Sequence, residues 1–193
     1  MKQLLILNAP PRAGKDTIAD HLEGWHRREF KGNLIDTALQ MALMSYVEWN
    51  GRYDLEAAGG LWMKDIPWGR LGGLSQRQYL IWLSEKIMKP LFGKSVFGQR
   101  FKDDLDFESD MCGRYRFVAP DGGFVEEVQP FLDDPEWEVI IVRLSRVGCT
   151  FEGDSRNYLS NISQHEVDIE NNTTIVDAIR KIEQFTKHIK ENK

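Results

Sequence analysis

The residues best able to do chemistry lie near the start of the chain, in the sequence Gly14-Lys15-Asp16-Thr17. An apolar run at residues 4–7 precedes them across a short loop, and a helical pattern follows them. Strand, loop and helix in this order form the context in which a phosphate-binding loop works. The first amides of a helix lack intrahelical partners and lie at its positive end, so they can hold a phosphate. Lys15 would then reach the outer phosphates of a nucleotide.

Two residues depart from the usual pattern G-x-x-x-x-G-K-[ST] of such loops. Ala9 replaces the first glycine, and Asp16 stands where serine or threonine usually binds Mg²⁺. We expect Asp16 to hold Mg²⁺ directly or through water, with Thr17 beside it. The alternative is an ordinary strand-to-helix turn with a chance Gly-Lys pair. The apolar run before the loop and the helical pattern after it favour the phosphate-binding loop.

Composition sets limits on the class of protein. The chain has 193 residues, of which 41% are hydrophobic and 28% charged, as in ordinary globular domains. A net charge of −5 makes a nucleic-acid backbone a poor partner, and no apolar run is long enough for a membrane span. Cys112 and Cys149 form neither a disulfide framework nor a zinc motif. The expected compartment is therefore the cytoplasm.

The order of apolar and helical patterns predicts an α/β fold. We expect strands at 4–7, 116–119, 139–142 and 167–169, and helices at 15–30, from 33 or 36 to 50, 75–89, 96–105, from 125, and from 173 or 174. Strands that alternate with helices indicate a parallel sheet covered on both faces, within a single domain over residues 1–193. Residues 51–73, rich in glycine, are expected to form an irregular flap. Ligands of such sheets bind at the carboxyl ends of the strands.

Other candidate residues follow the later strands. Asp121 comes directly after a buried strand and could hold Mg²⁺ or a water bound to it, or simply form a turn. Arg143, Arg146 and Arg156 surround a glycine-containing segment that we interpret as a mobile lid over residues 147–157. Arginines in that place favour contact with an anion. The alternative is a solvated loop in which Arg156 pairs with Asp154.

Asn171 and Asn172 follow the last strand. They could contact the edge of an adenine, or act as capping and turn residues.

Six stretches of the sequence resemble the bacteriophage deoxynucleoside monophosphate kinases, within the nucleoside monophosphate kinase group. They are NAPPRAGKDT (8–17), SQRQYLIWLSEKIMKPLFGKSVF (75–97), FVAPDGGFVEE (117–127), VRLSR (142–146), GDSRNYL (153–159) and DIENNTTIVDAI (168–179). The resemblance implies a three-layer α/β/α phosphate-loop kinase fold, Mg-ATP as phosphoryl donor, deoxynucleoside 5′-monophosphates as acceptors, and diphosphates as products. Small nucleotides are the expected partners, with neither nucleic acid nor membrane; a homodimer is left open. A phage-encoded chain would work in the host cytoplasm.

The resemblance also implies roles for individual residues. Those expected to bind ATP phosphates are Arg12, Ala13, Gly14, Lys15, Asp16, Thr17 and Arg146, with Asp16 and Thr17 at the metal. Those expected at the acceptor are Ile35, Asp36, Arg77, Glu85, Lys89, Phe97 and Asp121. Those expected to act in catalysis are Lys15, Asp121, Arg146 and Arg156, the two arginines from the lid. Where many relatives have an arginine two residues after the strand-end aspartate, this chain has Gly123, and where they have a large aromatic residue, often tryptophan, it has Phe97.

A chemical argument narrows the acceptor. A monophosphate has a second pKa of about 6, so its oxygen is already ionised near neutral pH and needs no general base. The sequence offers grouped cations and no convincing base, which favours a phosphate acceptor. Two alternatives stay open: a phosphate-loop kinase for another small acceptor, such as a sugar acid or a polynucleotide end, and a nucleotide-binding module without turnover.

Overall fold

The computed structural model describes residues 1–53, 63–154 and 156–191. They form two compact units, one of Met1–Phe30 with Gly98–Lys193 and one of Lys31–Phe97. Each is described by itself below, and the single-domain expectation stays a prediction.

The first unit is built on a parallel sheet, as the alternating patterns predict. The strands of its described part are β1 (Lys2–Asn8), β2 (His26–Arg27), β3 (Arg116–Ala119), β4 (Trp137–Ser145) and β5 (His165–Glu170). They lie in the order β2-β3-β1-β4-β5, and every neighbouring pair is parallel. Leu5 of β1 pairs with Val118 of β3 on one side and with Ile140 of β4 on the other. β1 is therefore central, with β3 and β4 on either side of its carboxyl end, where ligands of such sheets bind.

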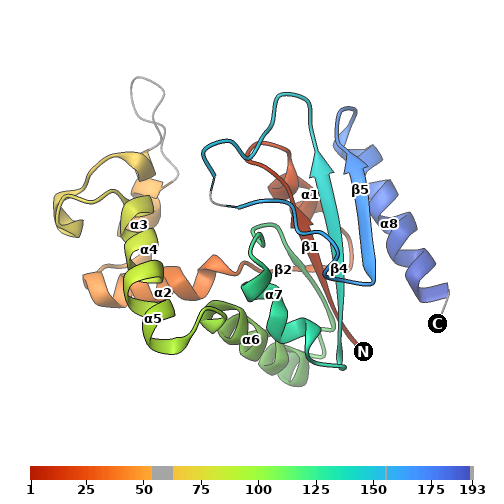
Figure 1. Ribbon diagram of the computed structural model, residues 1–193, viewed down its shortest axis with the longest axis horizontal. Coiled ribbons are helices and arrows are strands. Elements are labelled where there is room, and N and C mark those ends of the chain that lie inside the picture. The colour runs from red at the N-terminus through yellow and green to blue at the C-terminus, as the bar shows by residue number, and fades with distance from the viewer. Residues whose placement is uncertain (54–62, 155, 192–193) are drawn as a thin grey trace. The chain divides into compact units, whose positions relative to one another are not determined.

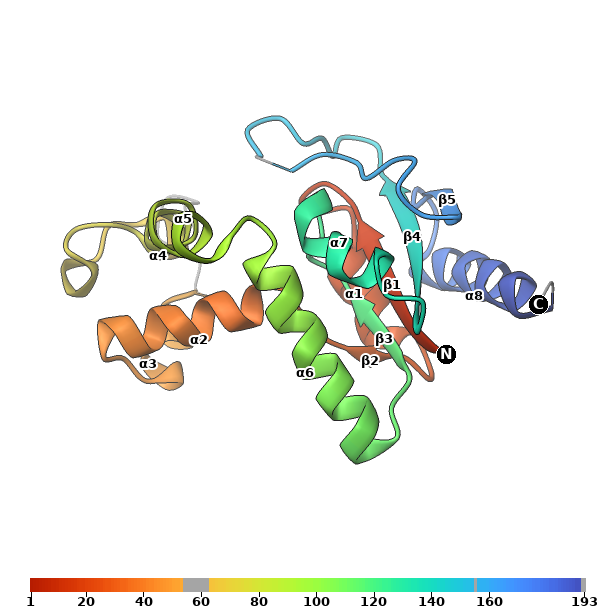
Figure 2. The same cartoon turned by 60° about the horizontal axis from the view of Figure 1, so that its bottom comes forward.

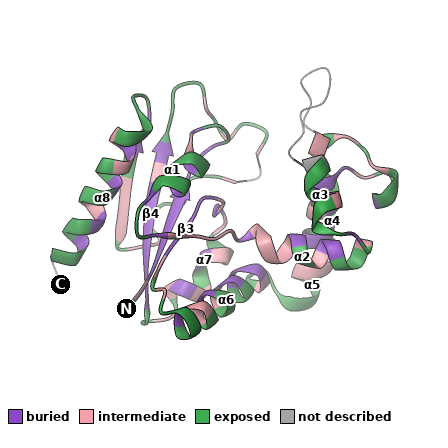
Figure 3. Ribbon diagram, turned by 180° about the vertical axis from the view of Figure 1, so that it is seen from behind, coloured by how far each residue is buried: buried purple, intermediate pink, exposed green. Residues whose placement is uncertain are grey.

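Helices cover both faces of this sheet (Figures 1 and 2). Successive side chains of a strand point to opposite faces, so Leu5 and Leu7 pack with α1 (Lys15–His21) and α8 (Ile175–Glu191). Leu4 and Ile6 pack on the other face with α7 (Val125–Leu132) and with the part of α6 (Val96–Cys112) that belongs to this unit. The central strands are buried on both faces, as Figure 3 shows. The expected three-layer α/β/α fold is confirmed.

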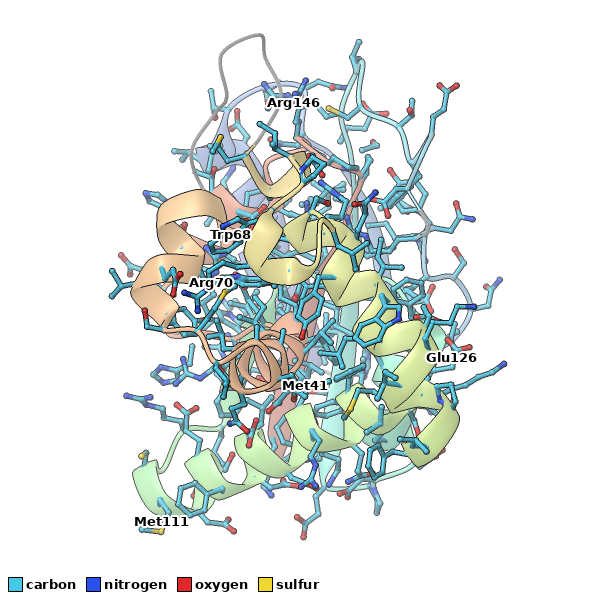
Figure 4. All side chains as sticks on the ribbon, turned by 90° about the vertical axis from the view of Figure 1, so that its left-hand side faces the viewer. Met41, Trp68, Arg70, Met111, Glu126 and Arg146 are labelled. Atoms are coloured by element: carbon cyan, nitrogen blue, oxygen red, sulfur yellow. The ribbon has the colours of Figure 1, made fainter. Side chains whose placement is uncertain are left out.

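The second unit is helical. Its elements are α2 (Lys31–Ala42), α3 (Tyr46–Tyr53), the short 3₁₀ turns η1 (Met63–Asp65) and η2 (Gly69–Leu71), α4 (Gln76–Trp82), the π-helical η3 (Leu83–Met88) and α5 (Lys89–Phe92). Trp49 and Leu83 lie at the centre of its apolar core. Arg70, labelled in Figure 4, donates to the carbonyl of Leu43 and pairs with Glu48, which links η2 to α3 and to the turn before it.

Two of the predicted helices were too long. The helix expected over 15–30 ends at His21, because Leu22 is extended and Gly24 turns the chain at a positive φ of 73°. The chain then forms β2, a strand of two residues that carries no sequence signal. The helix expected up to residue 50 is broken at Leu43, which has a left-handed φ of 50°, and resumes as α3.

Helix starts were predicted better than helix ends. Ser75, where a helix was expected to begin, caps α4 and forms a capping box with Gln78. Thr174 Oγ1 accepts from the amide of Asp177 at the start of α8. The helix expected over 75–89 is interrupted by η3 and extends to Phe92. The helix expected over 96–105 continues to Cys112.

The flap expected over 51–73 lies partly outside the described residues. Its described part holds the end of α3 and the turns η1 and η2. No helix in the described part of the chain is long and apolar enough to cross a membrane.

Candidate phosphate-binding site

The loop between β1 and α1 has the backbone of an anion-binding turn. Gly14 is the N-cap of α1 and is left-handed, with φ = 91°, and Arg12 is left-handed with φ = 66°. Gly14 directly precedes the right-handed residues of the helix. A left-handed residue followed by right-handed ones turns successive amides toward a common point, which forms a concave nest for an anion. The dipole of α1 adds positive potential at the same place.

Gly14 has two reasons to be glycine. Its left-handed backbone strains any residue with a side chain. A Cβ placed on it would also lie 2.7 Å from Nδ2 of Asn171, which is closer than real Cβ contacts come. That Nδ2 atom donates to the carbonyl of Ala13 at 2.8 Å. The loop is therefore packed from behind by a buried side chain of the segment after β5.

Lys15 and Asp16 lie together at the first turn of α1. Lys15 is the first helical residue and is only 8% exposed, and its Nζ is 3.7 Å from Oδ2 of Asp16. The other oxygen of Asp16 accepts from Nη2 of Arg27 at 3.2 Å. Thr17 is exposed. An ammonium group beside the amide nest is the arrangement that would neutralise the tail of a triphosphate.

The oxygen donors at this turn suit Mg²⁺ that is shared with a phosphate, rather than a metal ion held only by protein side chains. Among the described residues, no three His, Cys, Asp or Glu side chains gather closely enough to hold a metal ion. Mg²⁺ usually keeps several waters and takes one or two carboxylates together with substrate phosphates. The carboxylate of Asp16 and the hydroxyl of Thr17 are hard oxygen donors of this kind. They would hold the ion only in the company of a phosphate.

Asp121 follows β3 at the same edge of the sheet. Its Oδ1 accepts from the backbone amide of Phe30 at 3.0 Å, so part of its role is to fix the chain after β2. The next residue, Gly122, packs against Ile6 of β1 so closely that a Cβ there would lie 2.8 Å from its Cγ2. The aspartate is thus held next to the strand from which the phosphate loop begins.

Asn8 joins these parts and was not singled out by its sequence. It is the last residue of β1 and is 1% exposed. Its Nδ2 donates to the carbonyls of Gly122 (3.3 Å) and Asn157 (3.2 Å), and its Oδ1 accepts from the amide of Leu159 at 2.7 Å. One side chain therefore links the strand before the phosphate loop to the turn at Asp121, to the last residue of the proposed lid and to Leu159 just beyond it. Its sequence signal is a polar residue at the buried end of an apolar strand.

The three arginines expected to contact an anion have different environments. Arg143 is bound within the protein, because its guanidinium donates to Asp168, to Glu166 and to the carbonyl of Leu159. An anion would have to displace these partners, and the expected anion contact of Arg143 stays a prediction. Arg146 is exposed where the chain leaves β4 (Figure 4).

Arg156 pairs with Asp154, which is the alternative that the sequence left open. Its Nε and Nη2 donate to the two oxygens of that carboxylate at 2.9 and 2.6 Å. Asp154 raises the pKa of Arg156; burial opposes this, and Asp121 and Glu127 reinforce it. The guanidinium is therefore held charged among carboxylates near the end of β3.

The absence of a side chain at Gly123 leaves room for the side chain of Arg156. A Cβ on Gly123 would lie 2.7 Å from Cδ of Arg156 and 2.8 Å from its Cγ. A large side chain at 123 and Arg156 in its present position would occupy the same space. Glycine at position 123 is therefore required sterically by the present position of Arg156.

Apart from Asp121, the residues expected at the acceptor lie in the second unit. They are Ile35 and Asp36 of α2, Arg77 of α4, Glu85 of η3, Lys89 of α5, and Phe97 near the start of α6. Ile35 and Phe97 are buried, whereas Asp36 is exposed.

The acceptor-side cations have carboxylate partners. Nε of Arg77 is 2.5 Å from Asp65, and Nζ of Lys89 is 2.5 Å from Glu85. The hydrogen bond from Lys89 is the main cause of the lowered pKa of Glu85. Any anion that these cations bind must first compete with a carboxylate.

Comparison with known proteins adds a fold-level likeness. No protein-family model matches the sequence, and no curated protein matches it. Among solved structures, an unliganded sugar kinase from Janibacter sp. is similar with a TM-score of 0.53, at 9% sequence identity, over 97% of this chain and 95% of that one. A likeness at this identity concerns the fold, and it agrees with the three-layer α/β architecture described above.

Proposed function

We propose that this protein is a kinase that transfers the γ-phosphoryl group of ATP to a deoxynucleoside 5′-monophosphate. The observation that carries the proposal is the turn at Gly14 and Lys15. A left-handed glycine, the first turn of a helix and a buried lysine follow one another at the carboxyl end of the central strand. The kinase-like fold supports phosphoryl transfer in general.

On the donor side, the amides of the nest and Lys15 would hold the β- and γ-phosphates of ATP. Arg12, Ala13 and Thr17 complete this loop, and Arg146, which directly precedes the lid, would contact the nucleotide. Mg²⁺, held by Asp16 and Thr17 together with the phosphates, would neutralise charge that develops on the bridging oxygen.

On the acceptor side, the phosphate of the monophosphate would be held by Arg77 and Lys89, beside Ile35, Asp36, Glu85 and Phe97. One of its oxygens attacks the γ-phosphorus as the bond from that phosphorus to the β–γ bridging oxygen breaks. The products are a deoxynucleoside diphosphate and ADP. Charge builds on the moving group, and a planar arginine fork neutralises it well.

Arg146 and Arg156 are the arginines proposed for that task. Arg156 would exchange Asp154 for the moving phosphoryl group. Closure of the segment 147–157 would also exclude water, which otherwise competes as acceptor. Asp121 would stand between the acceptor and the metal. We further propose that the protein acts in the cytoplasm on small nucleotides. A measurement of its mass in solution would test for a homodimer.

The test is an ATP-coupled assay with each of the four deoxynucleoside monophosphates. We expect turnover with at least one of them, and its loss in Lys15→Ala and Arg146→Ala. Lys187→Ala, which changes a lysine on the exposed side of α8, is the matched control and should be fully active. Absence of turnover on all four acceptors would overturn the proposal.

A second candidate is a kinase for a sugar-type acceptor, including a sugar acid or a polynucleotide end. It is favoured by the structural likeness to a sugar kinase. A hydroxyl acceptor needs a base to remove its proton, and Asp36 or Asp121 would have to serve. Turnover with such acceptors, and a rate that falls steeply below the pKa of a carboxylate, would favour this candidate. Tight ATP binding without any product would favour a non-catalytic module instead.

A further inference from the structure

Asn171 is a buried residue in the turn between β5 and α8. It is 4% exposed, and its backbone amide donates to the carbonyl of Ser145 at 2.8 Å, which fixes its position beside the end of β4. Its side-chain Nδ2 donates to the carbonyl of Ala13 at 2.8 Å, across 158 residues of sequence. The buried side-chain amide of Asn171 therefore binds the peptide group between Ala13 and Gly14, which lies far away in the sequence.

The hydrogen bond from Asn171 to the Ala13 carbonyl also fixes the direction of the Gly14 N–H. In a trans peptide the carbonyl oxygen and the following N–H point in opposite directions. The carbonyl of Ala13 points back to Asn171, so the N–H of Gly14 points away from Asn171. The same Nδ2 atom would be 2.7 Å from a Cβ on Gly14, so the side chain also fills the space behind this glycine. Rotation of this peptide would break the bond from Asn171 and leave a buried amide without its acceptor.

We propose that Asn171 is a positioning residue for the phosphate nest. It holds the peptide between Ala13 and Gly14 in the one orientation that directs the Gly14 amide at the bound phosphate. This inference rests on the proposed function, since it assigns a role toward the polyphosphate of the same site. Asn171 itself touches the loop from behind and acts through it.

Asn172 provides a matched control. Its side chain is exposed, and its Oδ1 accepts from the amide of Val147 at 2.8 Å. Asn172→Asp keeps that acceptor oxygen and adds one negative charge close to the loop. Asn171→Asp adds the same charge at the neighbouring position but replaces the donor to Ala13 with an oxygen. Asn172→Asp shows what a charge near the loop does by itself. Asn171→Ser, which adds no charge and is too short to reach Ala13, removes the donated hydrogen bond alone.

The experiment measures binding of inorganic triphosphate and of a deoxynucleoside monophosphate by calorimetry. Triphosphate has no base, so a contact of Asn171 with adenine would not register. We expect Asn171→Asp to weaken triphosphate binding by at least about tenfold, because the charged ligand loses an oriented donor. Asn172→Asp should bind triphosphate within about twofold of the native chain, and both variants should keep the native affinity for the monophosphate.

A spectroscopic signal tests the orientation directly. Carbonyl-¹³C alanine and ¹⁵N-glycine labelling selects the amides of Ala-Gly pairs, and the sequence has two, at 13–14 and 58–59. In the native protein and in Asn172→Asp, we expect one of the two resonances to move downfield when triphosphate is added, as the Gly14 amide donates to it. In Asn171→Asp that movement should be lost.

The outcomes separate the inference from the proposed function. A native chain that binds neither triphosphate nor ATP contradicts both. Native binding together with unchanged binding and an unchanged glycine shift in Asn171→Asp overturns the role of Asn171 alone. If Asn171→Asp fails to fold, Asn171→Ser, which is too short to reach Ala13, is judged by the same criteria.

Discussion

Arg27 of β2 donates a hydrogen bond to one oxygen of Asp16, and the other oxygen of Asp16 lies near the ammonium group of Lys15. Nη2 of Arg27 lies 3.2 Å from Oδ1 of Asp16, while Oδ2 of the same carboxylate lies 3.7 Å from Nζ of Lys15. Arg27 also donates to Asp20 and Glu29, so its position is set by three carboxylates. The side chain proposed to hold Mg²⁺ is therefore oriented by a strand of only two residues.

Arg27→Lys should weaken the response to Mg²⁺. Lysine keeps the charge but lacks the planar fork that binds several carboxylates at once, so Asp16 loses its orientation. We expect the Mg²⁺ concentration for half-maximal turnover to rise by about two- to fivefold, the range expected for a partly exposed ion pair. In an Asp16→Asn background the same change should have no further effect. An effect of equal size in both backgrounds would show that Arg27 acts through something other than Asp16.

Gly123→Ala should reduce turnover by displacing Arg156. The added methyl group would lie 2.7 Å from Cδ of Arg156, so that side chain must move. We expect at least about a tenfold fall in kcat, a fraction of what an arginine at a transferring phosphoryl group can contribute. The double variant with Arg156→Ala should be no slower than Arg156→Ala alone. Gly32→Ala is the control, because a Cβ at that position meets nothing within 4 Å. Additive losses of kcat in the double variant of Gly123 and Arg156 would contradict the explanation.

Two substitutions of Asp121 should separate its structural role from its charge. Asp121→Asn keeps an oxygen to accept from the amide of Phe30, so the free energy of unfolding should change little. Asp121→Ala leaves that amide without its acceptor and should lower the free energy of unfolding by about 1–3 kcal/mol. If the charge serves catalysis, both variants should lose at least about tenfold in kcat. Full activity of Asp121→Asn would exclude a catalytic role for the carboxylate.

The stability of the fold should fall in acid through Glu166. Burial alone would raise the pKa of Glu166, but hydrogen bonds from the amide of Ser163, from Arg143 and from the amides of Asn161 and Ile162 outweigh it and lower the pKa to about 2, against an ordinary value of 4.5. Because the folded state has the lower pKa, this contribution to stability is complete above about pH 4.5 and disappears as the pH falls toward 2. It corresponds to at most about 3 kcal/mol, because solvent screens part of the interaction.

Urea unfolding at a series of pH values measures this contribution. Glu166→Gln should be less stable than the native chain at pH 6, and the difference should shrink as the pH falls. Glu126→Gln, at an exposed carboxylate of α7 (Figure 4), is the control and should follow the native curve. A constant difference between Glu166→Gln and the native chain across this range would mean that ionisation of Glu166 does not matter.

Several features of the fold could be predicted because their signals are local. The apolar run of β1, the helix start at Ser75 and the cap at Thr174 depend on residues within a few positions of one another. The break after α2 was missed because Leu43, a left-handed residue that is not glycine, leaves no mark in the sequence. The end of α1 is marked by Gly24, but the helical pattern was read past it to residue 30. β2 was missed for a related reason: two residues at the edge of a sheet are specified by pairing with β3, not by their own sequence.

The sequence by itself determined that a glycine and a lysine follow an apolar strand and open a helix, and this predicts both the parallel sheet and the place of a phosphate site. Only the tertiary structure decided which polar groups support that site. Asn171 reaches Ala13, Asn8 reaches Gly122 and Leu159, and Arg143 turns away to Asp168, through contacts between segments far apart in the chain. A hydrogen bond needs its partners within about 3 Å, and sequence spacing does not fix that distance once the chain has folded back on itself.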